Sequence, residues 1–242
     1  MPKKNETANK DVKTSPKIKV TKNGPYLVSG GIPVLKQTII ADTEGTSVGW
    51  REDIKYQLQE KCGLCRCGHS GNKPYCDGTH LKNEFDGTET AGDESYIDRP
   101  KETVGPTLKL LDIEEICASA RFCHRAGGIW NLIQESEKPE VKKIIIEEAS
   151  DCPSGRLIIQ DRKTGNLIEP NVEKSIVAIE DPWAGVSGPL RVNGCITIES
   201  AEGKTYRIRN RVTLCRCGKS QNKPFCDSSH YPEEHTHEDH EK

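Results

Sequence analysis

The chain has 242 residues but little apolar material: hydrophobic residues make up 33% of it, and the mean hydropathy is −0.70. Such a composition does not supply one large hydrophobic core, whereas several small units, each fixed by a metal or cluster, fit it better. No apolar run approaches the roughly 20 residues of a membrane helix. The sequence therefore predicts several small metal-held units and no association with a membrane.

Strong net charge and targeting signals are also missing. The formal net charge is −2, which gives no electrostatic reason to expect a nucleic-acid partner. The segment 1–22 is rich in lysine but has no apolar core and no arginine, unlike a secretory signal or a transit peptide. We therefore expect a cytoplasmic protein. A glycine-rich phosphate loop and an acid–base constellation are absent as well, so we expect no enzymatic activity.

Cysteine, in contrast, is abundant. The chain has eleven cysteines, and both the odd number and a C-x-C spacing favour metal binding over disulfides. Cys65 and Cys67 are two residues apart, so an extended segment points both side chains to one face. Cys76 and His80 are four residues apart, so one helical turn brings them together, and Asp77 can cap that turn. This stretch therefore predicts two ligand pairs at one metal site.

The same pattern returns near the other end of the chain. Four residues keep every ligand spacing of the first stretch, namely Cys215, Cys217, Cys226 and His230. The repeat extends upstream, because residues 24–32 match residues 188–196. The whole unit is therefore duplicated, with a longer insertion before the first cysteine pair.

These residues carry a resemblance to a known family. The stretch 65–80 fits throughout the signature C-x-C-x2-S-x3-P-x-C-D-G-(S/T/A)-x-H, and the chain resembles the tandem type of the CDGSH iron–sulfur (NEET) proteins. The second copy departs at one position, where Ser228 replaces glycine. The resemblance implies one [2Fe–2S] cluster per motif, with the C-x-C pair on one iron and the later cysteine and histidine on the other. The implied ligands are Cys65, Cys67, Cys76 and His80, and then Cys215, Cys217, Cys226 and His230.

Zinc is the alternative metal. Three cysteines and one histidine also form tetrahedral structural zinc sites, which would make the protein a zinc-stabilised interaction module without a redox role. The spacing argues against this, because zinc knuckles usually present C-x2-C. In a cluster, histidine ligation eases reduction, as in Rieske centres, and couples redox state and cluster release to pH. Electron transfer and cluster storage or transfer both stay open, with unidentified redox or cluster-acceptor proteins as partners.

A second resemblance covers the middle of the chain. Cys117 and Cys123 match a ferredoxin C-x2-C-x2-C run in which alanine replaces the second cysteine, and Cys152 is followed by proline. The segment resembles small divergent single-cluster ferredoxin-like domains. Three thiolates can hold a [3Fe–4S] cluster, or a [4Fe–4S] cluster with a fourth ligand from elsewhere. The alternative is a degenerate domain retained for packing, because buried free cysteine is ordinary.

The predicted fold is α+β. Two small β-rich units form an intramolecular pseudo-dimer in a monomer, with the ferredoxin-like domain alongside, because single-motif members of the resembling family pair by exchanging strands. The expected segments are a disordered tail at 1–21, the first unit at 22–100, the middle domain at 101–180, the second unit at 181–231 and a disordered tail at 232–242. Within them we expect strands at 26–28, 38–40, 55–59, 157–159, 175–179 and 206–212, and a linker at 88–105. We also expect a helix that starts at 112 with Asp112 as its N-cap, and a second helix at 139–149.

Residues near the motifs have secondary roles in this interpretation. Cationic side chains can offset the cluster charge, namely Arg66, Lys73, Arg216 and Lys223. Polar side chains can bond the loop or the sulfurs, namely Ser70, Asn72, Ser220 and Asn222. If the motif needs glycine for an unusual backbone dihedral, Ser228 strains the second site and makes its cluster the more labile one. Unassigned residues include Cys62 and Cys195, and the tail histidines His235, His237 and His240 form at most a weak metal site.

Overall fold

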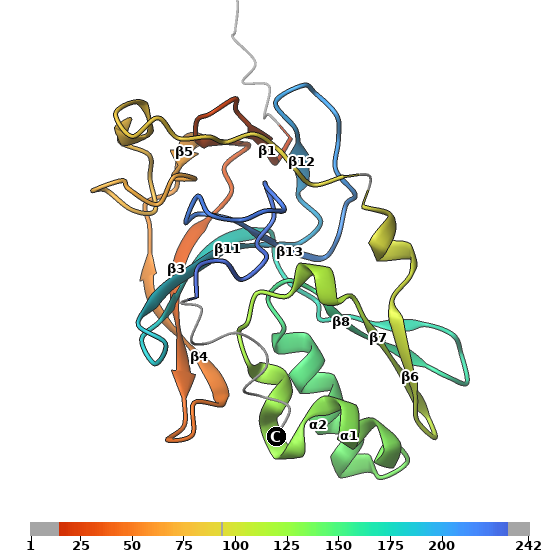
Figure 1. The fold of residues 1–242 in the computed structure, drawn as a ribbon. Helices are drawn as coiled ribbons and strands as arrows, with labels where there is room; N and C mark the ends of the chain where they lie inside the picture. Colours follow the sequence, from red (N-terminus) through yellow and green to blue (C-terminus); the bar gives the residue numbers. More distant parts are fainter. Residues whose placement is uncertain (1–14, 93, 232–242) are drawn as a thin grey trace, which may run out of the picture.

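The computed structural model describes residues 15–92 and 94–231, and the expected tails at 1–14 and 232–242 lie outside this range. Its strands form three sheets. Two of them combine the N-terminal and C-terminal thirds of the chain, and the third belongs to the middle segment, which lies below them with its two α-helices (Figure 1).

The first sheet has the order β12-β1-β2-β5. Its strands are β1 (Lys17–Val20), β2 (Tyr26–Ser29), β5 (Lys61–Leu64) and β12 (Thr197–Glu199). β1 pairs antiparallel with β2 and parallel with β12, with Lys17 opposite Thr197. A strand of the C-terminal part thus completes the sheet that leads into the first cysteine pair.

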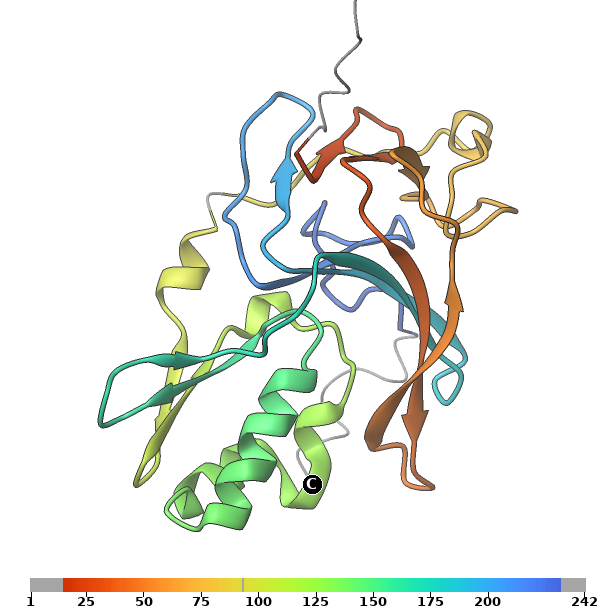
Figure 2. The same ribbon diagram turned by 180° about the vertical axis from the view of Figure 1, so that it is seen from behind.

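The second sheet has the order β13-β11-β10-β3-β4. Its strands are β3 (Val34–Ala41), β4 (Ser47–Lys55), β10 (Ser175–Asp181), β11 (Val186–Asn193) and β13 (Arg211–Leu214). β10 pairs antiparallel with β11 and parallel with β3, with Ile176 opposite Val34. The long β3–β4 hairpin of the N-terminal part therefore extends the C-terminal sheet, as the view from behind shows (Figure 2).

The pairings repeat with the sequence duplication. β1 and β10 occupy equivalent positions. Each pairs antiparallel with the next strand of its own unit and parallel with a strand from the other unit. β5 and β13 also correspond, since each pairs with that next strand and runs into a C-x-C pair. One apolar core lies between the two sheets and takes residues from both units, among them Ile18, Tyr26, Leu190 and Phe225. Such a core leaves neither unit complete without the other.

The middle segment has its own sheet and core. The sheet has the order β6-β7-β8-β9, formed by β6 (Lys101–Val104), β7 (Leu108–Asp112), β8 (Leu157–Asp161) and β9 (Leu167–Ile168). Two α-helices, α1 (Ile129–Leu132) and α2 (Pro139–Asp151), pack apolar side chains such as Ile129 and Ile145 against Leu108 and Leu110. Five 3-10 turns complete the described elements, at Thr79–Leu81, Ser95–Asp98, Glu114–Ile116, Phe122–Gly127 and Ile133–Glu135.

Five expectations about local structure are wrong. Lys17–Val20 is a strand rather than part of a tail, because β2 and β12 supply pairing partners that the local sequence does not reveal. The strand leading to Cys65 is Lys61–Leu64 and not 55–59, and the strand expected at 206–212 is confined to Arg211–Leu214. The expected linker at 88–105 contains β6. Asp112 ends β7 instead of capping a helix, since its carboxylate binds Arg156.

The expected helix at 139–149 and the strands at 26–28, 38–40 and 157–159 are confirmed, each with somewhat longer bounds. β10, which falls inside the range expected for the middle domain, pairs with β3 and β11 and with no strand of the middle sheet. In the described part of the chain, no helix has the length and apolarity to cross a membrane.

Candidate metal centres

Each duplicated motif presents its four candidate ligands as two close pairs. In the first motif the Sγ atoms of Cys65 and Cys67 lie 3.7 Å apart, and Cys76 Sγ lies 3.3 Å from His80 Nδ1. In the second motif the corresponding distances are 3.6 Å and 3.5 Å. Two thiolates on one tetrahedral metal, with metal–sulfur bonds of about 2.3 Å, lie about 3.8 Å apart. Each pair therefore has the spacing of two ligands on one metal.

The backbone of the loop places these pairs. The amide of Cys65 donates to Pro74 O at 2.8 Å, and the amide of Cys76 donates to Gly63 O at 2.9 Å. The second motif repeats both bonds with Pro224 and Thr213 as acceptors. These bonds hold the loop at both ligand pairs. The cysteine pair directly follows a strand, and the cysteine–histidine pair lies at a turn.

The motif serines fix the loop from inside. Ser70 Oγ donates to Tyr75 O at 2.6 Å and accepts from the amide of Asn72, and Ser220 does the same with Phe225 and Asn222. Their observed role is therefore loop rigidity. The aspartates act similarly: Asp77 accepts from the amides of Gly71 and Thr79. Hydrogen bonds from the Thr79 side chain and from these amides lower the pKa of Asp77 to about 2.

The motif arginines are buried and bound to carbonyl oxygens. The Arg66 guanidinium donates to Thr21 O and Gly87 O and stacks on the Tyr26 ring. Arg216 donates to Gly188 O at 2.5 Å and to the Glu180 carboxylate. Burial, followed by the charge of Arg216, lowers the pKa of His230 to about 4. Arg216 therefore acts electrostatically on one candidate ligand of the second motif, and the expected compensation of a cluster's charge stays a prediction.

The two motifs contact each other through their C-x-C-G turns. A Cβ atom added to Gly68 would lie 2.9 Å from Cys217 O, and one added to Gly218 would lie 3.0 Å from Cys67 O. Both glycines have positive φ, 81° and 80°. The turns therefore approach too closely for side chains, and each backbone lies beside a candidate ligand of the other motif.

Replacing Gly68 with alanine tests this contact. We expect a loss of about 1–2 kcal/mol from the left-handed backbone conformation and a further loss from the clash with Cys217. Iron content at the second motif should fall together with thermal stability, because the clash falls on a ligand residue of that motif. Gly71→Ala is the control, since Gly71 lies in the same loop at no positive φ. Iron lost from the first motif alone would contradict a shared contact.

The three cysteines of the middle domain line one cavity. Cys117, Cys123 and Cys152 are half-buried and face a cavity of about 660 Å³, together with Arg156 and Trp130. Burial, together with the charges of the other two thiols, raises the pKa of Cys123 well above its usual range. Three thiolates crowded at one cavity repel each other, so they ionise together only when a cation or a cluster compensates the charge. The cavity thus suits a group larger than a single ion.

A cationic side chain stands at this cavity. Arg156 forms a bidentate pair with the buried Asp112, at 2.6 and 2.9 Å, and Trp130 Nε1 donates to the same carboxylate. The carboxylate and the Cys117 thiol raise the pKa of Arg156, against the effect of burial. Arg156 therefore stays charged beside the thiols. Sequence reasoning missed Arg156, because its partner Asp112 was expected to cap a helix.

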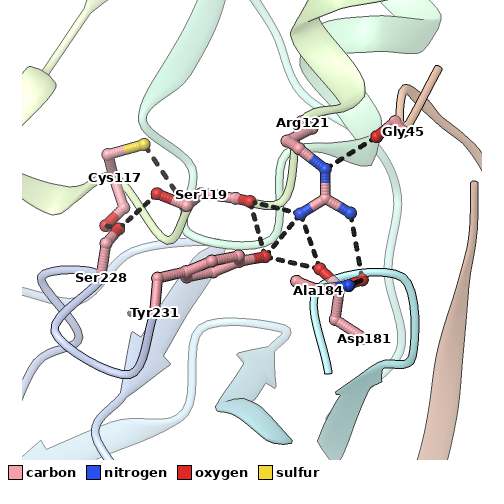
Figure 3. A network of polar contacts seen from close by, with 8 residues as sticks. All are labelled: Gly45, Cys117, Ser119, Arg121, Asp181, Ala184, Ser228 and Tyr231. Carbon is pink, nitrogen blue, oxygen red and sulfur yellow. Dashed lines mark hydrogen bonds and ion pairs between the residues drawn. The ribbon is translucent and has the colours of Figure 1, made fainter. Parts of the chain in front are cut away.

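The second motif is bonded to the cysteine loop of the middle domain (Figure 3). Ser228 Oγ lies 2.9 Å from Cys117 O and 2.8 Å from Ser119 Oγ. Tyr231, the residue after His230, donates to Ser119 O and contacts Arg121 at 2.6 Å. The φ of Ser228 is 72°, and the equivalent Gly78 has 87°, so the position does require a left-handed backbone. The Ser228 hydroxyl makes two hydrogen bonds in this conformation, and the expected greater lability of the second cluster stays a prediction.

A second connection reaches the third cysteine. The guanidinium of Arg211, on β13 just before the second C-x-C pair, donates to the carbonyl oxygens of Ala149, Ser150 and Cys152 at 2.6, 3.0 and 2.8 Å. These oxygens end α2, where a cation also meets the negative end of the helix dipole. The backbone carbonyls of both Cys117 and Cys152 are thus held by the C-terminal unit.

Other candidate residues have no such connections. Cys62 is half-buried against the main core, and Cys195 is exposed at a positive φ. Within residues 15–92 and 94–231, no three His, Cys, Asp or Glu side chains gather closely enough to hold a single metal ion. The tail histidines lie outside the described residues.

Comparison with protein-family models gives two families. The family described as iron-binding zinc finger, CDGSH type, matches residues 23–81 and again residues 187–231. The family described as divergent 4Fe-4S mono-cluster matches residues 104–162. No curated protein matches the chain. The two CDGSH matches coincide with the paired ligands, and the middle match coincides with the three-cysteine cavity. The chain therefore carries two CDGSH-type units with a divergent 4Fe-4S-type segment between them.

Proposed function

We propose that the protein binds one [2Fe–2S] cluster at each CDGSH motif and transfers electrons or clusters without being an enzyme. The observation that carries this proposal is the two-plus-two grouping of ligands, with 3.3–3.7 Å inside each pair. A two-iron centre needs two protein ligands on each iron, and each motif offers one such pair at a strand end and one at a turn. The cluster, when bound, supplies a one-electron redox centre, and the loop clamps hold its ligands in place.

Zinc fits this grouping less well. A single tetrahedral zinc ion needs all four ligands at about the same mutual spacing, near 3.8 Å for sulfurs. Among the described residues, no three His, Cys, Asp or Glu side chains gather closely enough to hold one metal ion, which supports a pair of metals instead. The family description includes the words iron-binding as well as zinc finger, so it is the grouping of the ligands that disfavours zinc.

We propose a third cluster in the middle domain. Three thiols on one cavity, a charged Arg156 beside them and a 4Fe–4S-type family match support it over retention for packing alone. Cys117, Cys123 and Cys152 supply three ligands, which suits a [3Fe–4S] cluster or a [4Fe–4S] cluster with one further ligand. The partners proposed for the whole protein are redox proteins or cluster-acceptor proteins.

Metal analysis tests these assignments together. Iron and acid-labile sulfide are quantified in the full chain, and oxidised and reduced samples are examined by electron paramagnetic resonance. We expect two histidine-ligated two-iron signals and a third signal that disappears in Cys123→Ser. A colourless protein with zinc at the motifs would overturn the proposal for the CDGSH units. If Cys123→Ser keeps all three signals, only the proposal of a third cluster is overturned.

Replacing His80 with cysteine tests the role of the histidine. A fourth thiolate adds negative charge to the cluster, so its reduction potential should fall by on the order of 100 mV or more. Thiolate is also not released by protonation near pH 6 as imidazole is, so bleaching of the first site should move to lower pH. The measurement is visible absorption during redox and acid titration. His69→Ala, in the same loop, is the control, and an unchanged bleaching pH would contradict a release role for His80.

We also propose that the duplicated units form an internal pseudo-dimer, so that the chain is a monomer. The support is the duplicated strand pairing, in which each sheet receives a strand from the other unit and leaves no need for a second chain. Analytical ultracentrifugation of the cluster-loaded protein should give 26.9 kDa. A species of twice that mass that persists on dilution would contradict the proposal.

A further inference from the structure

The two motif copies differ at the positions that meet the middle domain. Ser228 in the second copy stands where the first has Gly78, and Tyr231 stands where the first has Leu81. A Cβ atom added to Gly78 would meet nothing within 4 Å, and Leu81 is 79% exposed. Ser228 and Tyr231, in contrast, both bond to the loop 117–121 (Figure 3). The first copy therefore faces solvent at positions where the second copy is docked.

The docked side chains are adjacent to candidate ligands on both sides. Ser228 lies between Cys226 and His230 in sequence, and its hydroxyl bonds directly to the carbonyl of Cys117. The amide of Ser119 donates to Cys117 Sγ at 3.4 Å. The Tyr231 ring lies 4.7 Å from the His230 ring, and Tyr231 also lines the three-cysteine cavity. A short path of covalent and hydrogen bonds thus joins the second motif to this cavity.

The second motif also touches the first. Its Cys217 carbonyl lies against Gly68, and Gly218 lies against the Cys67 carbonyl. The three sites consequently form a series in which the second motif is central, with a backbone contact to the first motif and a hydrogen-bonded contact to the middle domain. Electron tunnelling weakens steeply with distance and is faster through bonded atoms than across gaps, so this order of contacts sets the order of exchange.

We propose that Ser228 is a coupling residue that joins the second motif to the three-cysteine cavity, so that the second site relays electrons within the chain while the first site exchanges them with an external redox protein. The inference rests on the clusters proposed above. In each step one electron leaves one site and arrives at its neighbour, no substrate bond forms or breaks, and the initial electron comes from a one-electron protein reductant at the exposed first motif.

The test uses the full chain loaded with iron and sulfide. A photoreductant delivers less than one electron per protein, and freeze-quench electron paramagnetic resonance follows the signals of the three sites. In the native chain the middle-domain signal should change as the second-site signal decays: it should grow for a [4Fe–4S] cluster and shrink for a [3Fe–4S] cluster. Ser228→Gly restores the residue of the first copy and removes the hydroxyl, and it should slow this transfer several-fold. Ser228→Ala also removes the hydroxyl but keeps a side chain, and it serves as a second variant if Ser228→Gly does not fold.

Gly78→Ser is the matched control, because a Cβ atom added at Gly78 would meet nothing within 4 Å, and all rates should stay at the native value. Equal transfer rates in the native chain and Ser228→Gly, with all three signals present, would overturn the coupling role of Ser228 and leave the clusters intact. Absence of iron and sulfide from the middle domain would instead overturn the third cluster and the relay together. The two failures are therefore distinguished by metal content.

Discussion

Replacing Asp181 with alanine is expected to lower the free energy of unfolding by about 3–5 kcal/mol. The side chains of Asp181 and Arg121 are 1% and 6% exposed and form a bidentate pair at 2.7 and 3.0 Å (Figure 3). Although burial acts to raise it, hydrogen bonds from Arg121 and Tyr231 hold the pKa of Asp181 below its usual range. Removing the carboxylate leaves the guanidinium buried without its counter-charge, which is costly.

The measurement is the midpoint of thermal unfolding, which should fall by about 6–20 °C for a chain of this size. Asp53→Ala is the control, because Asp53 pairs with Arg51 at the surface, where ion pairs contribute about 0–1 kcal/mol. The double replacement Asp181→Leu with Arg121→Met should recover much of the loss, because no charge is then left buried. If Asp181→Ala and Asp53→Ala lowered the unfolding midpoint by similar amounts, a special role for the buried pair would be contradicted.

Glu148 should make the protein less stable as the pH rises, and Glu148→Gln should remove this dependence. The side chain is 0% exposed, and neither carboxyl oxygen has a hydrogen-bond partner. Burial, opposed by Arg125 and assisted by Asp151, raises the pKa of Glu148 to about 8. The folded protein therefore holds a proton that the unfolded chain releases near pH 4.5. Stability contributed by this proton is fully present below that pH and is lost as the pH rises through 8.

The expected gain for Glu148→Gln is about 2 kcal/mol or more at pH 8 and much smaller at pH 6, since each unit of pKa shift corresponds to about 1.4 kcal/mol. Unfolding is measured at both pH values with the clusters loaded. Glu147→Gln is the matched control, because Glu147 is the exposed neighbour on α2 and pairs with Lys143 at the surface. The same pH dependence in Glu148→Gln and the native chain would contradict this account.

Short-range features of the fold were predictable from the sequence. The spacing of Cys76 and His80 indicated that one turn would bring them together, because local backbone geometry fixes such distances. Helix α2 followed from its apolar period and its proline start. The need for a left-handed residue at 228 also followed from the glycine in the first copy.

Features that depend on distant parts of the chain were not predictable. Lys17–Val20 becomes a strand only because residues 197–199 lie beside it. Asp112 was expected to cap a helix, whereas its charge is used by Arg156, 44 residues later. The strain expected at Ser228 took no account of hydrogen bonds to residues 117 and 119, which belong to another domain. In each case the interacting residue is far away in the sequence, so local sequence patterns do not indicate it.

The exchange of strands between the two units reverses the usual order of folding during synthesis. Domains generally fold from the N-terminus as they leave the ribosome. Here Val34 pairs with Ile176, and Lys17 pairs with Thr197. The first unit therefore leaves the ribosome with two strands whose partner strands have not yet been synthesised. The middle domain, whose sheet is complete at Ile168, precedes both. The final 70 or so residues then complete both CDGSH units at once, and a nascent chain released before Glu199 lacks a finished first unit as well as a second.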